Sequence, residues 1–260
     1  MLLQTSHTMI KETKKCFSIV NNDIGEVTED DNRECQTLLR AVDAFSLTTS
    51  SSLYVIDFLQ EKIVYASKNI MLLCGKSAEE IYSMGDDFYW QYIPDADIAK
   101  IITLRNETFN FLLQKPIQER CLYRLSMDMH FLIGDDERLF TQCSVPLFWK
   151  EKGLRLLLCA VSASAAKESG NAYLRKKGES VFYEFFFNEH KWKMQRVAKI
   201  NQIEMKILQL SAQGYTMEQI AEKICKSVDS VKTYKRQLFK KTQNNNIAGT
   251  LMYNLNYDLL

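Results

Sequence analysis

The stretch KSVDSVKTYKRQLFKK (Lys226–Lys241) holds six basic residues and one acidic residue, yet its apolar residues are regularly spaced. Wound as an α-helix, it gathers on one face Val228, Val231, Leu238 and Thr242, with Phe239 at the edge. The opposite face holds Lys232, Thr233, Arg236 and Lys240. A helix that is only solvated usually mixes both signs of charge, which this face does not. The pattern predicts a helix over 228–243 that packs by one face and presents a basic face to an anionic partner.

Charge is distributed unevenly along the 260 residues. Residues 196–260 carry ten Lys/Arg and five Asp/Glu, a balance of +5, whereas the rest of the chain has a balance of −4. The net charge of +1 alone predicts no polyanionic partner. The asymmetry, however, suggests a small nucleic-acid-binding module attached to a larger, mildly acidic part.

The seven cysteines are scattered, with no CxxC pair and no clustering with histidine. This spacing argues against a disulfide framework and against a zinc site, and it fits a reducing cytoplasm. The opening residues lack the continuous apolar core of a signal peptide, and the most apolar run, 154–163, is too short to span a bilayer. We therefore expect a cytoplasmic protein without a membrane partner.

Helix start and stop signals surround the basic helix. Three N-cap signals are present: Asn201 with Glu204, Thr216 with Gln219, and Ser227. Gly214 is placed to end the first helix, and Asn245 or Asn246 to open a last one. Residues 196–260 therefore predict four helices joined by short turns. The two middle helices form a helix-turn-helix, whose second helix would enter the major groove of DNA.

This C-terminal region resembles the LuxR/GerE-type helix-turn-helix family over roughly 200–257. The residues at the family's pattern positions are Glu204, Ile207–Leu208, Gly214, Ile220–Ala221, Ile224, Ser227 and Val231–Lys232. The resemblance implies that Lys232, Thr233 and Arg236 face DNA bases. It also implies a set of residues that face phosphates: Ser227, Tyr234, Lys235 and Lys240. The implied partner is a double-stranded DNA operator bound by a homodimer, which the last helix helps to form.

The N-terminal part reads as a polar tail with an amphipathic helix (1–45) followed by a mixed domain (46–163). The helix, 31–45, would bury Leu38, Leu39, Val42 and Phe45. Two apolar runs flank Gln60–Glu61 as a hairpin, short helices follow, and 94–114 contains a longer helix. Three strand-like runs complete the order: 120–133, 139–149 and 153–163.

This order resembles a PAS domain, a five-stranded antiparallel sheet with helices over one face. Tyr65, Ser67, Asn69 and Gly75, followed by SAEEI (77–81), look like the PAS strand-to-helix signature. The family implies a haem, a flavin, a small-molecule ligand or association alone. His130 is the one candidate axial ligand and reads better as a strand histidine, and Cys74 lacks the motif of a photoactive flavin site. We expect no cofactor and leave a small-molecule ligand open.

A linker and a small β-meander (164–195) connect this domain to residues 196–260. The strand at 181–187 is apolar on nearly both faces, which predicts cover on both sides or a partner. We therefore hypothesise that the meander couples sensor to output or forms part of a dimer interface. The whole chain is expected to be α+β, with a PAS-like antiparallel sheet, the meander and an all-α C-terminal module.

The expected function is a sequence-specific transcriptional regulator in which the PAS-like part controls the helix-turn-helix. An enzyme is not expected, because no GxSxG, HExxH, Walker or glycine-rich fingerprint is present. Two alternatives remain: a PAS-like interaction scaffold without ligand sensing, and a receiver-type response regulator. The signal, the operator sequence and the sign of regulation are not encoded in any pattern that we recognise.

Overall fold

The computed structural model describes residues 15–67, 74–164, 166–197, 199–242, 246–247 and 249–251. The chain divides into two compact units. The first extends to Arg175 and also takes in Tyr183–Lys193. The second comprises Lys176–Phe182 and the residues from Met194 onward. No helix in the described ranges combines the length and the apolar character needed to cross a membrane.

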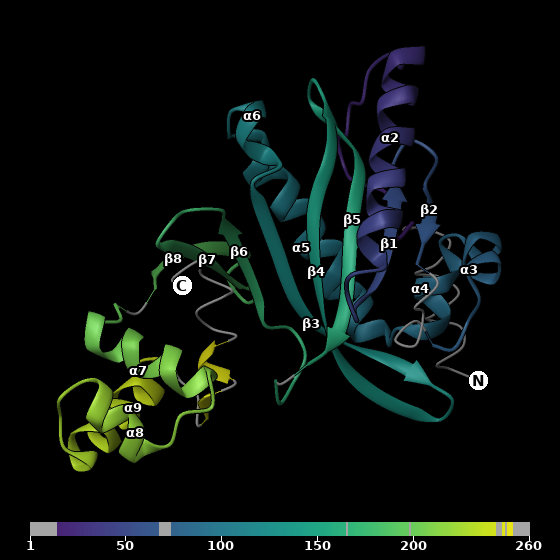
Figure 1. Cartoon of the computed structure of the whole chain (residues 1–260). Coiled ribbons are helices and arrows are strands. Elements are labelled where there is room, and N and C mark those ends of the chain that lie inside the picture. The colour runs from purple at the N-terminus through teal and green to yellow at the C-terminus, as the bar shows by residue number, and fades with distance from the viewer. Residues whose placement is uncertain are drawn as a thin grey trace. The chain divides into compact units, whose positions relative to one another are not determined.

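The strands form one sheet in the order β2-β1-β5-β4-β3-β6-β7-β8 (Figure 1). The strands of the PAS-like part are β1 (Ser52–Asp57), β2 (Lys62–Ala66), β3 (Tyr123–Ile133), β4 (Asp136–Lys150) and β5 (Gly153–Ala163). β1 pairs antiparallel with β2 and β5, and β4 with β3 and β5. The predicted α+β class and the N-terminal antiparallel sheet are confirmed, and these five strands form part of a larger sheet.

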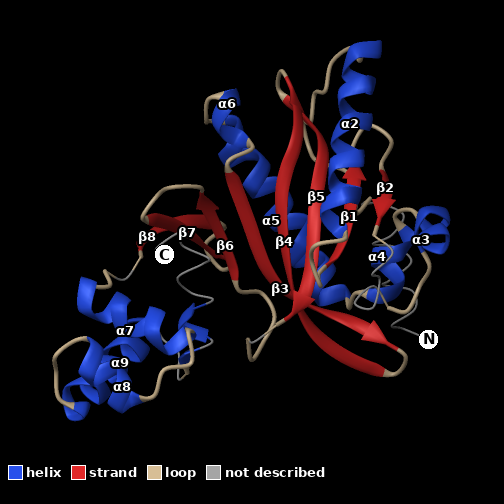
Figure 2. Cartoon of the chain, viewed as in Figure 1, coloured by secondary structure: helices blue, strands red, loops and turns tan. Residues whose placement is uncertain are grey.

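Helices lie along this sheet, as Figure 2 shows. They are α2 (Glu29–Ser46), α3 (Ala78–Met84), α4 (Asp87–Tyr92), α5 (Asp95–Leu113) and α6 (Ile117–Arg120). The predicted cap Ser77 begins α3 through a capping box with Glu80. Of the PAS signature, residues 68–73 lie outside the described ranges, and Cys74 is half-buried, its left-handed backbone (φ 58°) forming part of a turn.

Helices cover both faces of β1, whereas the PAS resemblance implied helices over one face only. Alternate β1 residues Tyr54 and Ile56 join the main core, while Leu53 and Val55 join a smaller cluster with Val42 of α2. Successive side chains of a strand point to opposite faces, so every residue of β1 is buried. α2 is the second layer that accounts for this pattern. Its predicted core residue Phe45 is instead 54% exposed.

The predicted meander is present, but it is not a separate module. Its strands are β6 (Ala172–Lys176), β7 (Val181–Phe186) and β8 (Lys191–Arg196), and β6 lies next to β3 in the sheet. Phe111 of α5 contacts Tyr183 of β7, with ring centroids 4.8 Å apart. Phe185 is the buried residue of β7 and the others are half-buried, so the expected cover on both faces is partial.

The second unit contains α7 (Gln202–Ala212), α8 (Met217–Lys223) and α9 (Val228–Thr242). Both predicted capping boxes, Asn201 with Glu204 and Thr216 with Gln219, are formed. Gly214 follows α7 with φ +85°, a left-handed conformation that favours glycine. Asn246 opens a further helical turn, because its side-chain oxygen accepts from the Gly249 amide at 2.7 Å. Most of this predicted last helix lies outside the described residues.

Candidate DNA interface and sensor cavity

α9 is fixed by its cap and by its apolar stripe. The Ser227 hydroxyl accepts from the Ser230 amide at 3.2 Å, as expected of an N-cap. Val231, Leu238 and Thr242 are buried, and Val231 packs in a cluster with Ile207 of α7 and Ile220 of α8. The two preceding helices therefore determine which face of α9 is left to solvent.

The residues predicted to face bases lie on that free surface. Lys232, Thr233 and Arg236 are all exposed, on one side of α9. Lys232 forms an ion pair with Asp229 at 3.2 Å, with side chains 49% and 90% exposed. The Thr233 hydroxyl donates to the Asp229 carbonyl at 2.9 Å. An ion pair that is this exposed contributes little stability. Lys232 can therefore give it up for a contact with nucleic acid at a small cost in free energy.

The residues predicted to face phosphates divide into two kinds. Ser227 and Lys240 are exposed, whereas Tyr234 and Lys235 are half-buried. Tyr234 packs against the small core of the second unit, which gives its ring a structural role as well. Partial burial lowers the pKa of Lys235 below its ordinary value. The assignment of these four residues to phosphates stays a prediction.

An ion pair between a buried glutamate and a partly exposed lysine holds α9 against α7. Glu204 is fully buried, and its two carboxylate oxygens accept from Lys241 Nζ at 2.8 and 2.7 Å. The same carboxylate accepts from the Asn201 amide at 2.9 Å, and Lys241 also donates to the Lys199 carbonyl at 3.2 Å. The sequence predicted Glu204 as a capping residue and as a position of the family pattern, but it did not predict the link to Lys241. The one available signal was a glutamate in the apolar stripe of a helix.

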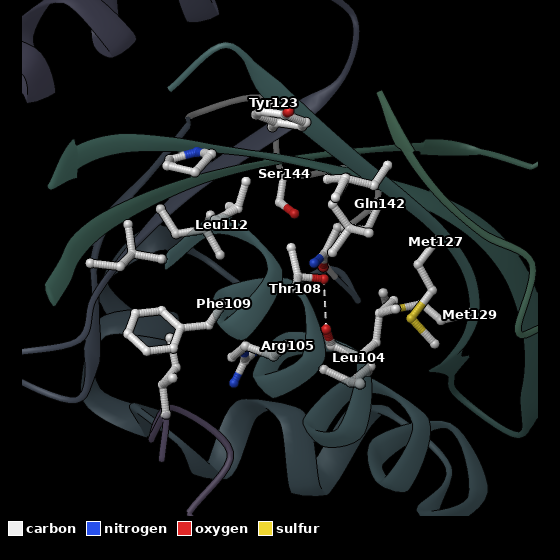
Figure 3. A pocket seen from close by; sticks show the side chains of 17 residues that line it. Leu104, Arg105, Thr108, Phe109, Leu112, Tyr123, Met127, Met129, Gln142 and Ser144 are labelled. Carbon is white, nitrogen blue, oxygen red and sulfur yellow. Dashed lines mark hydrogen bonds between the residues drawn. The ribbon is translucent and has the colours of Figure 1, made fainter. Parts of the chain in front are cut away.

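The first unit contains a cavity between α5 and strands β3–β5 (Figure 3). The cavity has a volume of about 50 Å³. Its wall is mainly apolar, with Leu112 of α5 and Met127 and Met129 of β3 among the lining residues. Gln142 and Ser144 of β4 bring polar groups to the same space. The sequence had no pattern that predicted this wall.

The side chain of Gln142 belongs to a buried hydrogen-bond network with Tyr54 and Tyr89. The Tyr54 hydroxyl donates to Gln142 Oε1 at 2.5 Å, and the Tyr89 hydroxyl lies 3.3 Å from the same oxygen. The two tyrosine hydroxyls also hydrogen-bond to each other. Burial raises the pKa of both tyrosines well above the ordinary value, so both remain neutral. The network fixes the amide of Gln142 and directs its nitrogen away from the tyrosines.

The candidate haem ligand His130 is held by an acid. Its Nδ1 lies 2.9 Å from Asp97 of α5, and its amide donates to the same carboxylate at 2.8 Å. Lys100 and Ser169 also contact Asp97, at 3.0 and 2.7 Å. No cluster of three or more His, Cys, Asp or Glu suited to a metal ion occurs among the described residues. His130 lies on β3 with Asp97 as its hydrogen-bond partner.

Comparison with known families identifies the C-terminal unit. Residues 201–253 match the GerE model of bacterial regulatory proteins of the luxR family. This segment is a LuxR-family helix-turn-helix domain, as its residues predicted. A search of curated proteins finds no match.

Solved structures with similarity to the chain include two VqmA proteins and a PAS domain. The Vibrio cholerae VqmA dimer, solved without its target DNA, is 16% identical over 84% of this chain and 86% of that one, with a TM-score of 0.33. A phage VqmA in complex with DPO is 11% identical over 88% and 93%, with a TM-score of 0.29. The BvgS PAS domain from Bordetella pertussis is 17% identical over 50% and 89%, with a TM-score of 0.32.

Proposed function

We propose that this chain is a sequence-specific transcriptional regulator in which a PAS-like sensor controls a LuxR-type helix-turn-helix. One observation carries the proposal: α9 buries Val231 and Leu238 while it leaves Lys232, Thr233 and Arg236 exposed on a capped helix. That is the geometry with which a recognition helix enters the major groove. Contact, charge and positioning account for the function, and no chemical step is required.

The recognition surface combines two kinds of contact. Lys232, Thr233 and Arg236 would meet base edges, because Arg and Lys donate to the guanine O6 and N7 acceptors. Ser227, Tyr234, Lys235 and Lys240 would contact phosphates, which position the helix but carry no sequence information. A homodimer would place two such helices on an inverted repeat, since the symmetry of the protein is matched by that of the site.

The sensor would act through its internal cavity. VqmA is described in complex with DPO and in complex with ligand and DNA. By analogy, a small molecule would occupy the space beside α5 in this chain and alter the regulator's behaviour on DNA. Such a protein would work in the cytoplasm, where both its operator and a diffusible ligand are available.

Genome-wide DNA capture with the tagged full-length chain tests the proposal. Lys232→Ala/Arg236→Ala is the test variant. Lys206→Ala/Arg196→Ala removes the same charge from exposed positions of the same unit and is the matched control. We expect sharp peaks that share a short inverted repeat, lost in the test variant and kept in the control. Equal loss of peaks in both variants would mean that the chain binds DNA only through non-specific electrostatic attraction. Unchanged peaks in the test variant would mean that α9 is not the recognition helix.

A further inference from the structure

A second hollow lies between α2 and the sheet. Residues of α2, β1, β2, α3 and β5 line it. Cys35, Leu39, Val64 and Leu156 belong both to its wall and to the smaller apolar cluster under α2, so the hollow is separate from the cavity beside α5. Its volume is about 510 Å³, which falls in the size range of small-molecule sites.

The wall of this hollow contains a buried hydrogen-bond donor without an acceptor. Arg155 of β5 and Asp57 of β1 are 4% and 2% exposed, and Arg155 Nε lies 3.4 Å from Asp57 Oδ2. Arg155 Nη2 donates to Asn32 Oδ1 of α2 at 2.8 Å. Arg155 Nη1 is buried and has no hydrogen-bond partner among the described residues. Leaving such a donor unpaired is costly, so Nη1 indicates an oxygen ligand.

The carboxylate of Asp57 is already occupied. Its Oδ1 accepts from the backbone amides of Leu59 and Gln60 at 2.8 and 3.3 Å. Its Oδ2 accepts from the Gln60 side chain at 2.9 Å and faces Arg155 Nε. The acid therefore holds the guanidinium in place and offers little to a donor on an incoming ligand.

The remaining polar groups of the wall favour an anion. Lys62 of β2 is exposed and forms no ion pair within the described part of the chain. The Tyr82 hydroxyl accepts from the Ala66 amide at 3.0 Å, which leaves its own proton to donate. Two basic residues, Lys62 and Arg155, and one acidic residue, Asp57, line the hollow. The net charge of the wall is therefore positive.

We propose that this hollow binds an organic acid whose carboxylate accepts hydrogen bonds from Arg155 and Lys62. Its apolar body would lie against Leu39, Val64 and Leu156. Two cationic donors match the two oxygens of a carboxylate, whereas a phosphate group would bring more charge and more acceptors than they satisfy. Because Arg155 is also bonded to Asn32, an occupied hollow would fasten the first half of α2 to the sheet.

Methyl NMR of the full-length protein, labelled at leucine, valine and methionine, tests the proposal. Three probes share one carbon frame and differ in charge: 3-phenylpropanoate, 3-phenylpropanamide and 3-phenylpropylamine. Titrations followed at Leu39 and Val64 give the affinity of each probe for the wild type, for Lys62→Met and for Arg155→Lys. Lys167→Met is the matched control, because Lys167 is an exposed lysine of the first unit outside the hollow.

We expect the acid to bind at least about fivefold more tightly than the amide, because hydrogen bonds to a charged group are stronger. Lys62→Met should weaken binding of the acid about two- to fivefold, the range of an exposed ion pair, and leave the amide unaffected. Arg155→Lys keeps the charge but removes the Nη1 donor, and it should weaken the acid about tenfold or more. Lys167→Met should change neither. If Arg155→Lys fails to fold, the effect of Lys62→Met decides the question.

Four outcomes would overturn the proposal. An amide that binds as tightly as the acid, or equal effects of Lys62→Met on both, would exclude recognition of a carboxylate. Tighter binding of the amine would mean that Asp57 selects the ligand. Movement of the Met127 and Met129 signals alone would place the probes in the cavity beside α5. Unmoved signals with every probe would mean that the hollow holds only water. The DNA-capture result is independent of all four.

Discussion

At the residue scale, the pair Glu204–Lys241 is the contact with the largest expected effect on stability. Among the described residues, Lys241→Met would leave the fully buried carboxylate of Glu204 with the Asn201 backbone amide as its one remaining partner. We expect the free energy of unfolding of the fragment 196–260 to fall by about 2 kcal/mol, less than for a fully buried pair because Lys241 is 37% exposed. Urea unfolding measures the change. The exposed neighbour Lys240→Met should stay within about 0.5 kcal/mol of wild type, and equal stability of both variants would refute the argument.

Individual residues of α9 should also separate affinity from specificity. Arg236→Ala should cost about 1–3 kcal/mol of binding and relax the preference at one base pair. Lys240→Ala should weaken binding to all sequences alike and reduce the slope of log K against log salt by about 0.9. Fluorescence anisotropy at several salt concentrations, with the captured operator and single-base variants of it, measures both effects. A base preference that depends on Lys240 and not on Arg236 would reverse the two roles.

At the element scale, Asp97 and Asp128 hold the segment between β5 and β6. Asp97 accepts from Ser169, and Asp128 accepts from Ser164 at 2.8 Å and from Asn171 at 3.2 Å. Burial opposes ionisation of Asp97, but hydrogen bonds from His130, Ser169 and Lys100 outweigh it and hold its pKa below the ordinary value. The segment is thus held to α5 and β3 by two carboxylates, those of Asp97 and Asp128.

This arrangement predicts a pH dependence. The lowered folded-state pKa of Asp97 stabilises the fold above the ordinary aspartate pKa of about 3.9, and this contribution is lost as the pH falls through the folded value. Asp97→Asn should therefore be less stable than wild type at pH 7, and the difference should shrink below about pH 4. Thermal unfolding from pH 3 to pH 7 measures it. A difference that stays constant across this range would contradict the assignment.

Sequence patterns within a few residues of each other predicted the helices and strands. Contacts between residues far apart in the sequence were not predicted. The capping residues Ser77, Asn201 and Thr216 act within one helical turn, so their spacing is visible in the sequence. The Glu204–Lys241 and Asp97–Ser169 contacts join residues 37 and 72 positions apart. The apolar periodicity of a helix also does not show how far along the helix its packing partner extends. For this reason Phe45, at the end of α2, was expected to be buried but is exposed. The cavity depends on how α5 and three strands meet, and no local pattern encodes that.

At the scale of the whole molecule, the hypothesis that the meander couples sensor to output stays a prediction. Replacing 172–193 by a flexible linker should leave operator binding by the second unit intact and abolish its response to a cavity ligand. Anisotropy with and without a small molecule that binds the first unit measures both quantities. The fragment 196–260 is the control for DNA binding alone. Full regulated binding by the replaced chain would dismiss the hypothesis.

The helix α5 contacts the cavity, the segment between β5 and β6, and the strand β7. Its middle lines the cavity through Leu104 and Thr108, its first turns hold Ser169 through Asp97, and its last turn meets Tyr183 through Phe111. A genetic screen for strains that ignore the signal should therefore collect substitutions along this one helix. Lineages that adapt the cavity to a new ligand would have to alter the same helix, so a change in ligand preference and a change in the unstimulated level of transcription should be inherited together.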